Sequence, residues 1–160
     1  MGRLWDTETG HWINDEINIV RPGFNSGYGI IQGLGIYFPA APTALVNFNG
    51  PEFVWTKKVV PTGLQFLTSE KLGSQYLNDI FVGAFLDGRL YHFDLTADRY
   101  HLALPSELNS KVLQNWSSSG YEDIVFGTGF GGISSMNIGP DGLLYVVSVE
   151  HGKCLVPSDR

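Results

Sequence analysis

The feature that most constrains this chain is a series of short β-rich segments separated by tight turns, clearest between residues 133 and 156. Residues 133–138 are typical of a short strand. Pro140-Asp141-Gly142 then supplies a turn, because proline presets φ and glycine accepts a positive φ. Residues 143–149 are rich in Leu, Tyr and Val, and His151-Gly152 turns the chain into a third segment. The order strand, turn, strand, turn, strand predicts an antiparallel meander.

The pattern recurs in two earlier parts of the chain, near residues 2–20 and 78–95. One register aligns three dipeptides, Leu4-Trp5, Ile80-Phe81 and Leu144-Tyr145. A competing register aligns three segments that begin with glycine, at Gly2, Gly88 and Gly142. Repeated antiparallel units of about 40–50 residues are typical of β-propellers, and the longer spacing here indicates inserted loops.

At 160 residues the chain is expected to form a single domain, residues 1–160. No long segment shows the 3.6-residue period of an amphipathic helix. We therefore expect an all-β domain of β-propeller-type antiparallel meanders, with about three blades. Their approximate ranges are 1–50, 51–127 and 128–160.

Segments between the meanders carry local expectations. Residues 30–50 are too apolar for a solvated linker, so an ordered connecting loop is expected there. Residues 51–55 are typical of a short edge strand, and residues 100–104 and 124–127 of outer strands. The one plausible helix covers residues 106–116, with a serine as its N-cap.

Charge and composition exclude several classes of function. A net charge of −6 disfavours a surface that follows nucleic-acid phosphates, so no nucleic-acid partner is expected. No run of 18 apolar residues is present, which predicts no membrane span. The chain enters a strand-like run directly after Met1, which predicts no signal peptide on this chain. The single cysteine, Cys154, excludes an internal disulfide framework and a cysteine-cluster metal site.

Two conspicuous patterns have structural rather than catalytic interpretations. Seven aromatic residues alternate along the expected strands, which favours a core between blades over a sugar-stacking platform: Trp5, Phe53, Trp55, Phe81, Tyr91, Phe93 and Tyr145. The glycine-rich stretch 127–132 is similar to a phosphate loop, but no helix and no Gly-Lys-Ser/Thr sequence follow it. Close backbone packing is the expected role of that stretch.

Three stretches, in order, carry a resemblance to a known family. Residues 5–27 contain Thr7-Glu8-Thr9-Gly10, Asp15-Glu16-Ile17-Asn18 and Gly23-Phe24-Asn25-Ser26-Gly27. Residues 61–93 and residues 139–153 match two later blades. With these motifs the chain resembles the C-terminal half of the soluble quinoprotein (pyrroloquinoline quinone-dependent) glucose/sorbosone and aldose sugar dehydrogenases. That resemblance implies half of a six-bladed β-propeller.

The resemblance also implies site residues. In the family, a glycine carbonyl at the position of Gly10 binds the calcium that clamps the quinone, and the next carbonyl would be that of His11. Asp15 would lie near the cofactor and Glu16 near a structural calcium. Thr9 stands where the family commonly has glutamine. The implied cofactor-binding residues are thus Thr9, Gly10 and Asp15, and the implied metal ligands are Gly10, His11 and Glu16.

Each of these residues also has a plainer interpretation. Carboxylate oxygens suit calcium, but Asp15-Glu16 is also compatible with a solvated turn before a strand. His11 is compatible with an ordinary histidine on a surface loop. A nucleophilic serine is disfavoured, because Asn25-Ser26-Gly27 lacks the first glycine of a Gly-x-Ser-x-Gly elbow.

The chain departs from the family where the quinone's carboxylates would be held. A lysine is expected after the strand that ends at Phe85, but Leu86 stands there. Two arginines are expected around residues 129–131, which are Gly-Phe-Gly. Pyrroloquinoline quinone carries three carboxylates, and burying them without cationic partners is costly. The family's catalytic histidine and arginine lie in the N-terminal half, so no catalytic residue is assigned here.

Three functional hypotheses follow from these motifs. The first is a sugar dehydrogenase-like propeller part without independent catalysis, whose other half is missing. The second is a non-catalytic binding or structural module that closes by self-association into a homo-oligomer. The third is a sugar-oxidising site with quinone and calcium, completed by a second chain. The resemblance further suggests a sugar as ligand and a periplasmic or secreted location.

Overall fold

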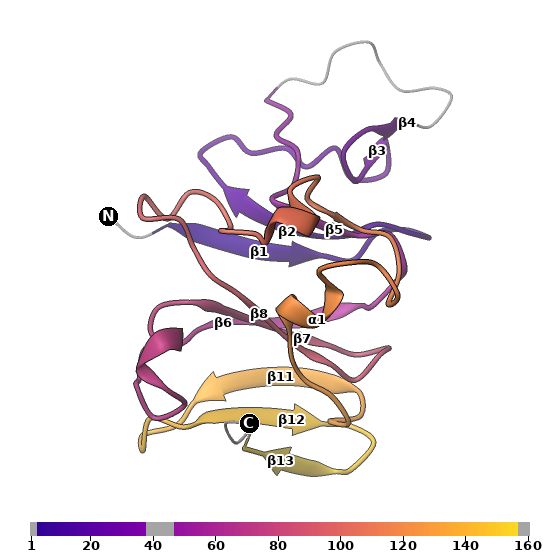
Figure 1. Cartoon of the computed structure of the whole chain (residues 1–160). Coiled ribbons are helices and arrows are strands. Elements are labelled where there is room, and N and C mark those ends of the chain that lie inside the picture. The colour runs from indigo at the N-terminus through magenta and orange to yellow at the C-terminus, as the bar shows by residue number, and fades with distance from the viewer. Residues whose placement is uncertain (1–2, 38–46, 157–160) are drawn as a thin grey trace.

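The computed structural model describes residues 3–37 and 47–156, where the regular structure is predominantly β-strand. The first sheet has the order β1-β2-β5-β9, formed by β1 (Leu4–Glu8), β2 (Asp15–Val20), β5 (Phe53–Trp55) and β9 (Val112–Leu113). Its neighbouring strands are antiparallel, except that β5 and β9 run parallel. A separate hairpin, β3 (Ile31–Gln32) and β4 (Ile36–Tyr37), follows β2 (Figure 1).

The second and third sheets are antiparallel. The second has the order β10-β8-β7-β6, formed by β6 (Pro61–Phe66), β7 (Ile80–Ala84), β8 (Leu90–Phe93) and β10 (Val125–Gly127). The third is a meander of β11 (Ile133–Ile138), β12 (Leu144–Ser148) and β13 (Lys153–Leu155). The all-β prediction and the meander predicted from residues 133–156 are confirmed.

The three sheets pack against each other in the order first, second, third (Figure 1). Strand β6 of the middle sheet contacts both β1 and β11. Between the first and second sheets the rings of Phe53, Trp55, Tyr91 and Phe93 lie 5.0–5.9 Å apart, within the range of favourable aromatic pairing. A second core, which includes Phe81, joins the second sheet to the third.

The predicted aromatic core is therefore confirmed for the members that the structure buries: Trp5, Phe53, Trp55, Phe81, Tyr91 and Phe93. Burying each such side chain contributes roughly 1.5–3 kcal/mol. Tyr145 differs, because it is half-buried and its hydroxyl donates a hydrogen bond to Asp141.

Several local predictions are wrong. Residues 51–55 do not form an edge, because β5 lies between β2 and β9 and all three of its residues are buried. The helix predicted over residues 106–116 is reduced to the 3-10 turn η2 (Ser106–Leu108), and the short helix α1 (Tyr121–Ile124) begins later. Another 3-10 turn, η1 (Ser74–Tyr76), precedes β7.

The predicted outer strands have different outcomes. Residues 124–127 supply β10 at the edge of the second sheet, as expected. Residues 100–104 contribute only an isolated bridge between Leu95 and Leu102. The loop expected over residues 30–50 contains the β3–β4 hairpin, and its residues 38–46 lie outside the described part of the chain.

The sheets draw their strands from distant parts of the sequence. β5 and β9 come from the range 51–127, yet they complete the sheet that begins with β1 and β2. Two of the aligned dipeptides, Ile80-Phe81 and Leu144-Tyr145, lie on the strand that comes second along the chain in its sheet. Leu4-Trp5 instead lies on the first strand of its sheet. Among the described residues, no helix is long and apolar enough to cross a membrane.

Candidate functional site

The candidate site begins at the loop between β1 and β2, where the buried Asp15 carboxylate ties two loops together. Its Oδ1 accepts a hydrogen bond from the Gly10 N–H at 2.9 Å, and its Oδ2 accepts one from each of the Val59 and Val60 N–H groups at 2.7 Å. Val60 has a φ of 56°, a conformation that β-branched residues rarely adopt. Asp15 therefore stabilises a strained turn between the first and second sheets, and both its oxygens are engaged by N–H donors.

Glu16 lies on the opposite side of β2, because consecutive side chains alternate along a strand. The register places Glu16 opposite Glu8, and Asn18 opposite Asp6, on one face of the β1–β2 hairpin. Glu16 is only 3% exposed, so the alternative of a solvated turn at Asp15-Glu16 is wrong. The structure thus separates the predicted residues into two sets, with Gly10 and Asp15 in one and Glu16 in the other.

The Glu16 carboxyl is only partly satisfied. Its Oε1 accepts a hydrogen bond from the Gly33 N–H at 2.7 Å, while its buried Oε2 has no hydrogen-bond partner. Burial is the main cause that raises the pKa of Glu16 to about 7; the Gly33 N–H opposes this shift, and the charge of Glu8 adds to it. Burial also raises the pKa of Glu8, against the hydroxyl hydrogen bond that Ser26 donates to it at 2.7 Å.

This face fits a hard cation. Calcium binds carboxylate oxygens and backbone carbonyls, and its charge would lower the cost of burying two carboxylates side by side. The Oε2 of Glu16 makes no hydrogen bond and can accept such an ion, although the Asn18 side chain is near enough to lower the Glu16 pKa. Glu8 offers a second carboxylate directly across the ladder. Glu8 was not predicted as a site residue, although its place opposite Glu16 follows once the hairpin register is known.

The loop residues fit calcium less well. His11 is exposed, as its plainer interpretation predicts, and its carbonyl oxygen accepts a hydrogen bond from the Lys58 ammonium at 3.2 Å. A calcium ion at that carbonyl would have to displace this cation. Gly10 is required by space, because a Cβ there would lie 2.0 Å from the Ile13 carbonyl oxygen. Thr9 is half-buried at the end of β1.

The positions at which the family places its quinone-binding cations do come together. Leu86, Gly129 and Gly131 line a hollow of about 320 Å³. Its wall also includes Glu150, His151 and Asp87, and the Asp87 carboxyl is buried and paired with Arg89. The described residues that line it include no lysine or arginine to pair with three carboxylates, so this hollow does not fit pyrroloquinoline quinone.

The glycines of this hollow serve close packing, as predicted for residues 127–132. A Cβ on Gly88 would lie 2.9 Å from the Gly131 carbonyl oxygen, and the Phe130 N–H donates to the Gly88 carbonyl at 3.2 Å. The glycine-rich stretch therefore brings the loop after β10 against the loop between β7 and β8.

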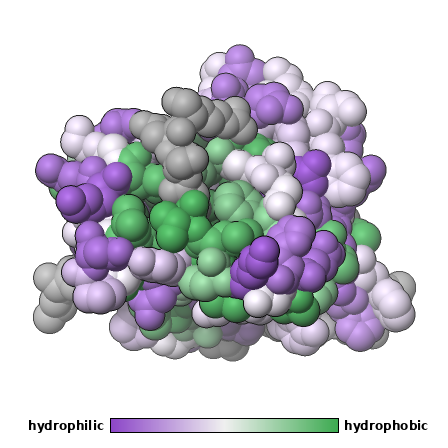
Figure 2. All heavy atoms as spheres, turned by 90° about the horizontal axis from the view of Figure 1, so that it is seen from below, coloured by the Kyte–Doolittle hydropathy of each residue, from purple (hydrophilic) through white to green (hydrophobic). Residues whose placement is uncertain are grey.

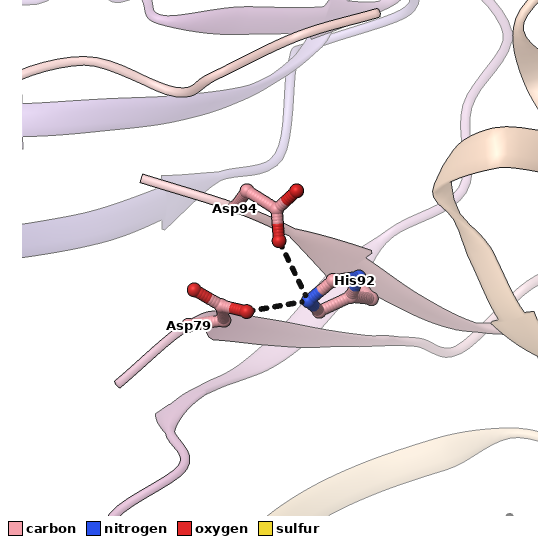
Figure 3. Close-up of side chains that lie close together, drawn as sticks. All are labelled: Asp79, His92 and Asp94. Carbon is pink, nitrogen blue, oxygen red and sulfur yellow. Dashed lines mark hydrogen bonds and ion pairs between the residues drawn. The ribbon is translucent and has the colours of Figure 1, made fainter. Parts of the chain in front are cut away.

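A second cluster of candidate ligands was missed by sequence reasoning. Asp79, His92 and Asp94 lie at the other end of the second sheet, around the first residue of β7 and the last of β8 (Figure 3). Their alternation around two predicted strands was visible in the sequence, but no motif singled them out.

A model of the family described as glucose/sorbosone dehydrogenase matches residues 1–156. The chain belongs to this family. It is 27% identical over 163 residues to aldose sugar dehydrogenase YliI of Escherichia coli, and 25% identical over 153 residues to a protein of Synechocystis. These matches cover 98% and 93% of this chain, but only 38% and 32% of the two relatives.

Solved structures of family members share the fold. A putative oxidoreductase (glucose dehydrogenase) from Thermus thermophilus has a TM-score of 0.64 at 21% identity, over 98% of this chain and 41% of that one. The PQQ-bound form of an aldose sugar dehydrogenase from Streptomyces coelicolor has a TM-score of 0.59 at 19% identity, over 99% and 36%. The predicted family and the β-propeller-type fold with three blades are both confirmed.

Proposed function

We propose that this chain is part of a sugar-oxidising β-propeller, in which it contributes a calcium site at Glu16, while further blades supply the quinone's cationic partners and the catalytic groups. The observation that carries the calcium site is the buried, unpaired Oε2 of Glu16 beside Glu8. Family membership supports the sugar-oxidising role, with an aldose as the substrate class.

Sugar oxidation by the chain alone is not expected. The described lining of the hollow beside Leu86 has no lysine or arginine, and the chain spans 36% of the relative whose solved form holds PQQ. A quinone bound next to these blades would have to receive cationic partners from elsewhere, because three buried carboxylates need them. The remaining blades would come from a longer chain or from a partner.

Calcium is expected to raise the thermal midpoint of the wild-type chain, because an ion that binds only the folded state stabilises it. Glu16→Gln should lose most of this shift, and Glu70→Gln, a matched change at an exposed residue, should keep it. The measurement is thermal unfolding in chelator-treated buffer with and without calcium. An equal shift in wild type and Glu16→Gln would refute the calcium site.

The same samples test the limits of the proposal. With calcium, pyrroloquinoline quinone, glucose and an electron-accepting dye, the chain alone is expected to reduce no dye above the rate without protein. Quinone-dependent dye reduction by the chain alone would contradict the claim that its site is incomplete.

A second candidate function, a module that closes by self-association, is favoured by one exposed apolar face. Val147, Val149 and Val156 on and beside β12 and β13 are 41%, 55% and 43% exposed. Figure 2 shows apolar side chains gathered on the side viewed from below, where the third sheet lies in Figure 1. Such a face usually marks an interaction site.

We propose that this face packs against another blade, either of further propeller chain or of a second copy. Light scattering separates the two cases. A stable mass near twice 17.6 kDa indicates closure by self-association. A mass of 17.6 kDa that persists at high concentration indicates that the face packs against further propeller chain instead.

A further inference from the structure

The cluster at the far end of the second sheet has the composition of a transition-metal site. β7 and β8 pair with Ile80 opposite Phe93 and Phe81 opposite His92. Continued by one residue, this register sets Asp79 opposite Asp94. Because side chains alternate, Asp79, His92 and Asp94 all lie on the same face of the ladder, and Figure 3 shows the three converging.

The ligand atoms are already close together. The His92 Nε2 lies 3.0 Å from the Asp79 Oδ2 and 3.5 Å from the Asp94 Oδ1. One ligand atom from each of the three residues lies within 4.8 Å of the other two. In a tetrahedral zinc site with bonds of about 2.0–2.2 Å, neighbouring ligand atoms lie roughly 3.3–3.6 Å apart. The observed spacing therefore needs only small side-chain shifts to admit an ion.

The charges also call for a cation. Carboxylates set directly opposite each other across an antiparallel ladder repel. A single proton on Nε2 cannot make a good hydrogen bond to both oxygens at once. In the described part of the chain, the ion pairs give neither aspartate an arginine or lysine partner.

The surroundings hold the imidazole in place and leave room beside it. The rings of Tyr76 and Phe81 lie 5.0 and 5.1 Å from that of His92. His92 and Asp94 also line a hollow of about 330 Å³, whose wall includes Asp123. Asp79 and His92 are only 13% and 15% exposed, whereas Asp94 is 63% exposed. The cluster is therefore a partly enclosed site with access from solvent.

We propose that Asp79, His92 and Asp94 bind a divalent transition-metal ion of the zinc class, with a coordination position left for water or a small ligand beside the hollow. Imidazole together with carboxylate suits zinc and its neighbours, whereas calcium and magnesium prefer oxygen ligands alone. The site lies at the opposite end of the second sheet from the Leu86 hollow and does not depend on the proposed calcium site. Its effect is to fasten the ends of β7 and β8.

The test is a zinc titration by calorimetry on metal-free protein, in a Cys154→Ser background because Cys154 is an exposed free thiol that can itself hold zinc. One zinc per chain is expected to bind. His92→Ala and Asp94→Asn should each weaken binding at least tenfold, while His151→Ala, at an exposed histidine, should leave it unchanged. Asp94 is largely exposed, so its variant is expected to fold normally.

Cobalt provides an independent readout. Cobalt in the protein should give the intense visible absorption of a tetrahedral site, and this absorption should be lost in His92→Ala. Zinc binding that is equally tight in His92→Ala and Asp94→Asn, or no binding at all by the parent protein, would overturn the proposal. A calcium titration of the same variants separates this site from Glu16, since calcium affinity should not change in His92→Ala.

Discussion

Asp15→Ala is expected to lower the free energy of unfolding by at least roughly 4.5 kcal/mol, because hydrogen bonds to a charged group are worth about 1.5–3 kcal/mol each and three are lost together. The N–H groups of Gly10, Val59 and Val60 would be left without their acceptor. The turn at Val60 would also lose the contacts that hold its left-handed backbone. A loss of this size approaches the whole stability of many domains.

The measurement is the urea midpoint of unfolding at neutral pH. Asp15→Asn is expected to recover only part of the loss, since its amide N–H₂ would face N–H donors on one side. Asp123→Asn, at an exposed aspartate, is the matched control and should stay within about 0.5 kcal/mol of wild type. We call the three hydrogen bonds to the Asp15 carboxylate the Asp15 clamp. A cost below about 1 kcal/mol for Asp15→Ala would show that this clamp does not stabilise the fold.

The Asp15 clamp shows where sequence reasoning stops. The strand over residues 15–20 was predictable from its β-branched pattern, and β2 covers that range. The acceptor role was not, because two of the three donors lie 44 and 45 residues further along the chain. No local pattern marks a backbone N–H that will need a partner from another loop.

The buried aromatic residues show that membership of the core can be predicted from the sequence. Period-2 alternation assigns side chains to a face, and a face crowded with large rings must be covered. Trp55 and Phe93 were therefore predictable as core residues. The position of β5 inside its sheet was not, because β9, which covers its other edge, lies more than fifty residues away and runs parallel to it.

The zinc-type cluster lies between these two cases. Alternation puts Asp79 and Phe81 on one face of β7, and His92 and Asp94 on one face of β8. The hairpin then joins these two strand faces into one face of the sheet. Pairing depends on the length of the turn. A two-residue turn at Asp87-Gly88 would shift the ladder by two residues, which keeps the face but changes the partner. The actual pairing of Phe81 with His92 was needed to set the aspartates opposite each other.

The same dependence on register governs Glu16, whose stability contribution is expected to fall as the pH rises. The folded-state pKa of about 7 lies above the value of 4.5 for the unfolded chain. Between these values the folded state holds a proton that the unfolded state has lost, so stability decreases with rising pH. The favourable contribution is complete below pH 4.5 and lost above about pH 7, with a total near 3 kcal/mol at about 1.36 kcal/mol per unit.

Unfolding free energies measured by urea across that range in chelator-treated buffer provide the test. Glu16→Gln cannot ionise, so its stability should fall less steeply with pH than that of wild type, and the stability of the variant relative to wild type should rise between pH 4.5 and about pH 7. Glu70→Gln should keep the wild-type slope, because Glu70 is exposed. Equal slopes for wild type and Glu16→Gln would mean that the Glu16 carboxylate is stabilised in the folded protein without a metal. A shallower pH dependence in Glu16→Gln would instead show that the Glu16 carboxyl is costly to ionise in the absence of a cation. A calcium ligand on this face requires that property.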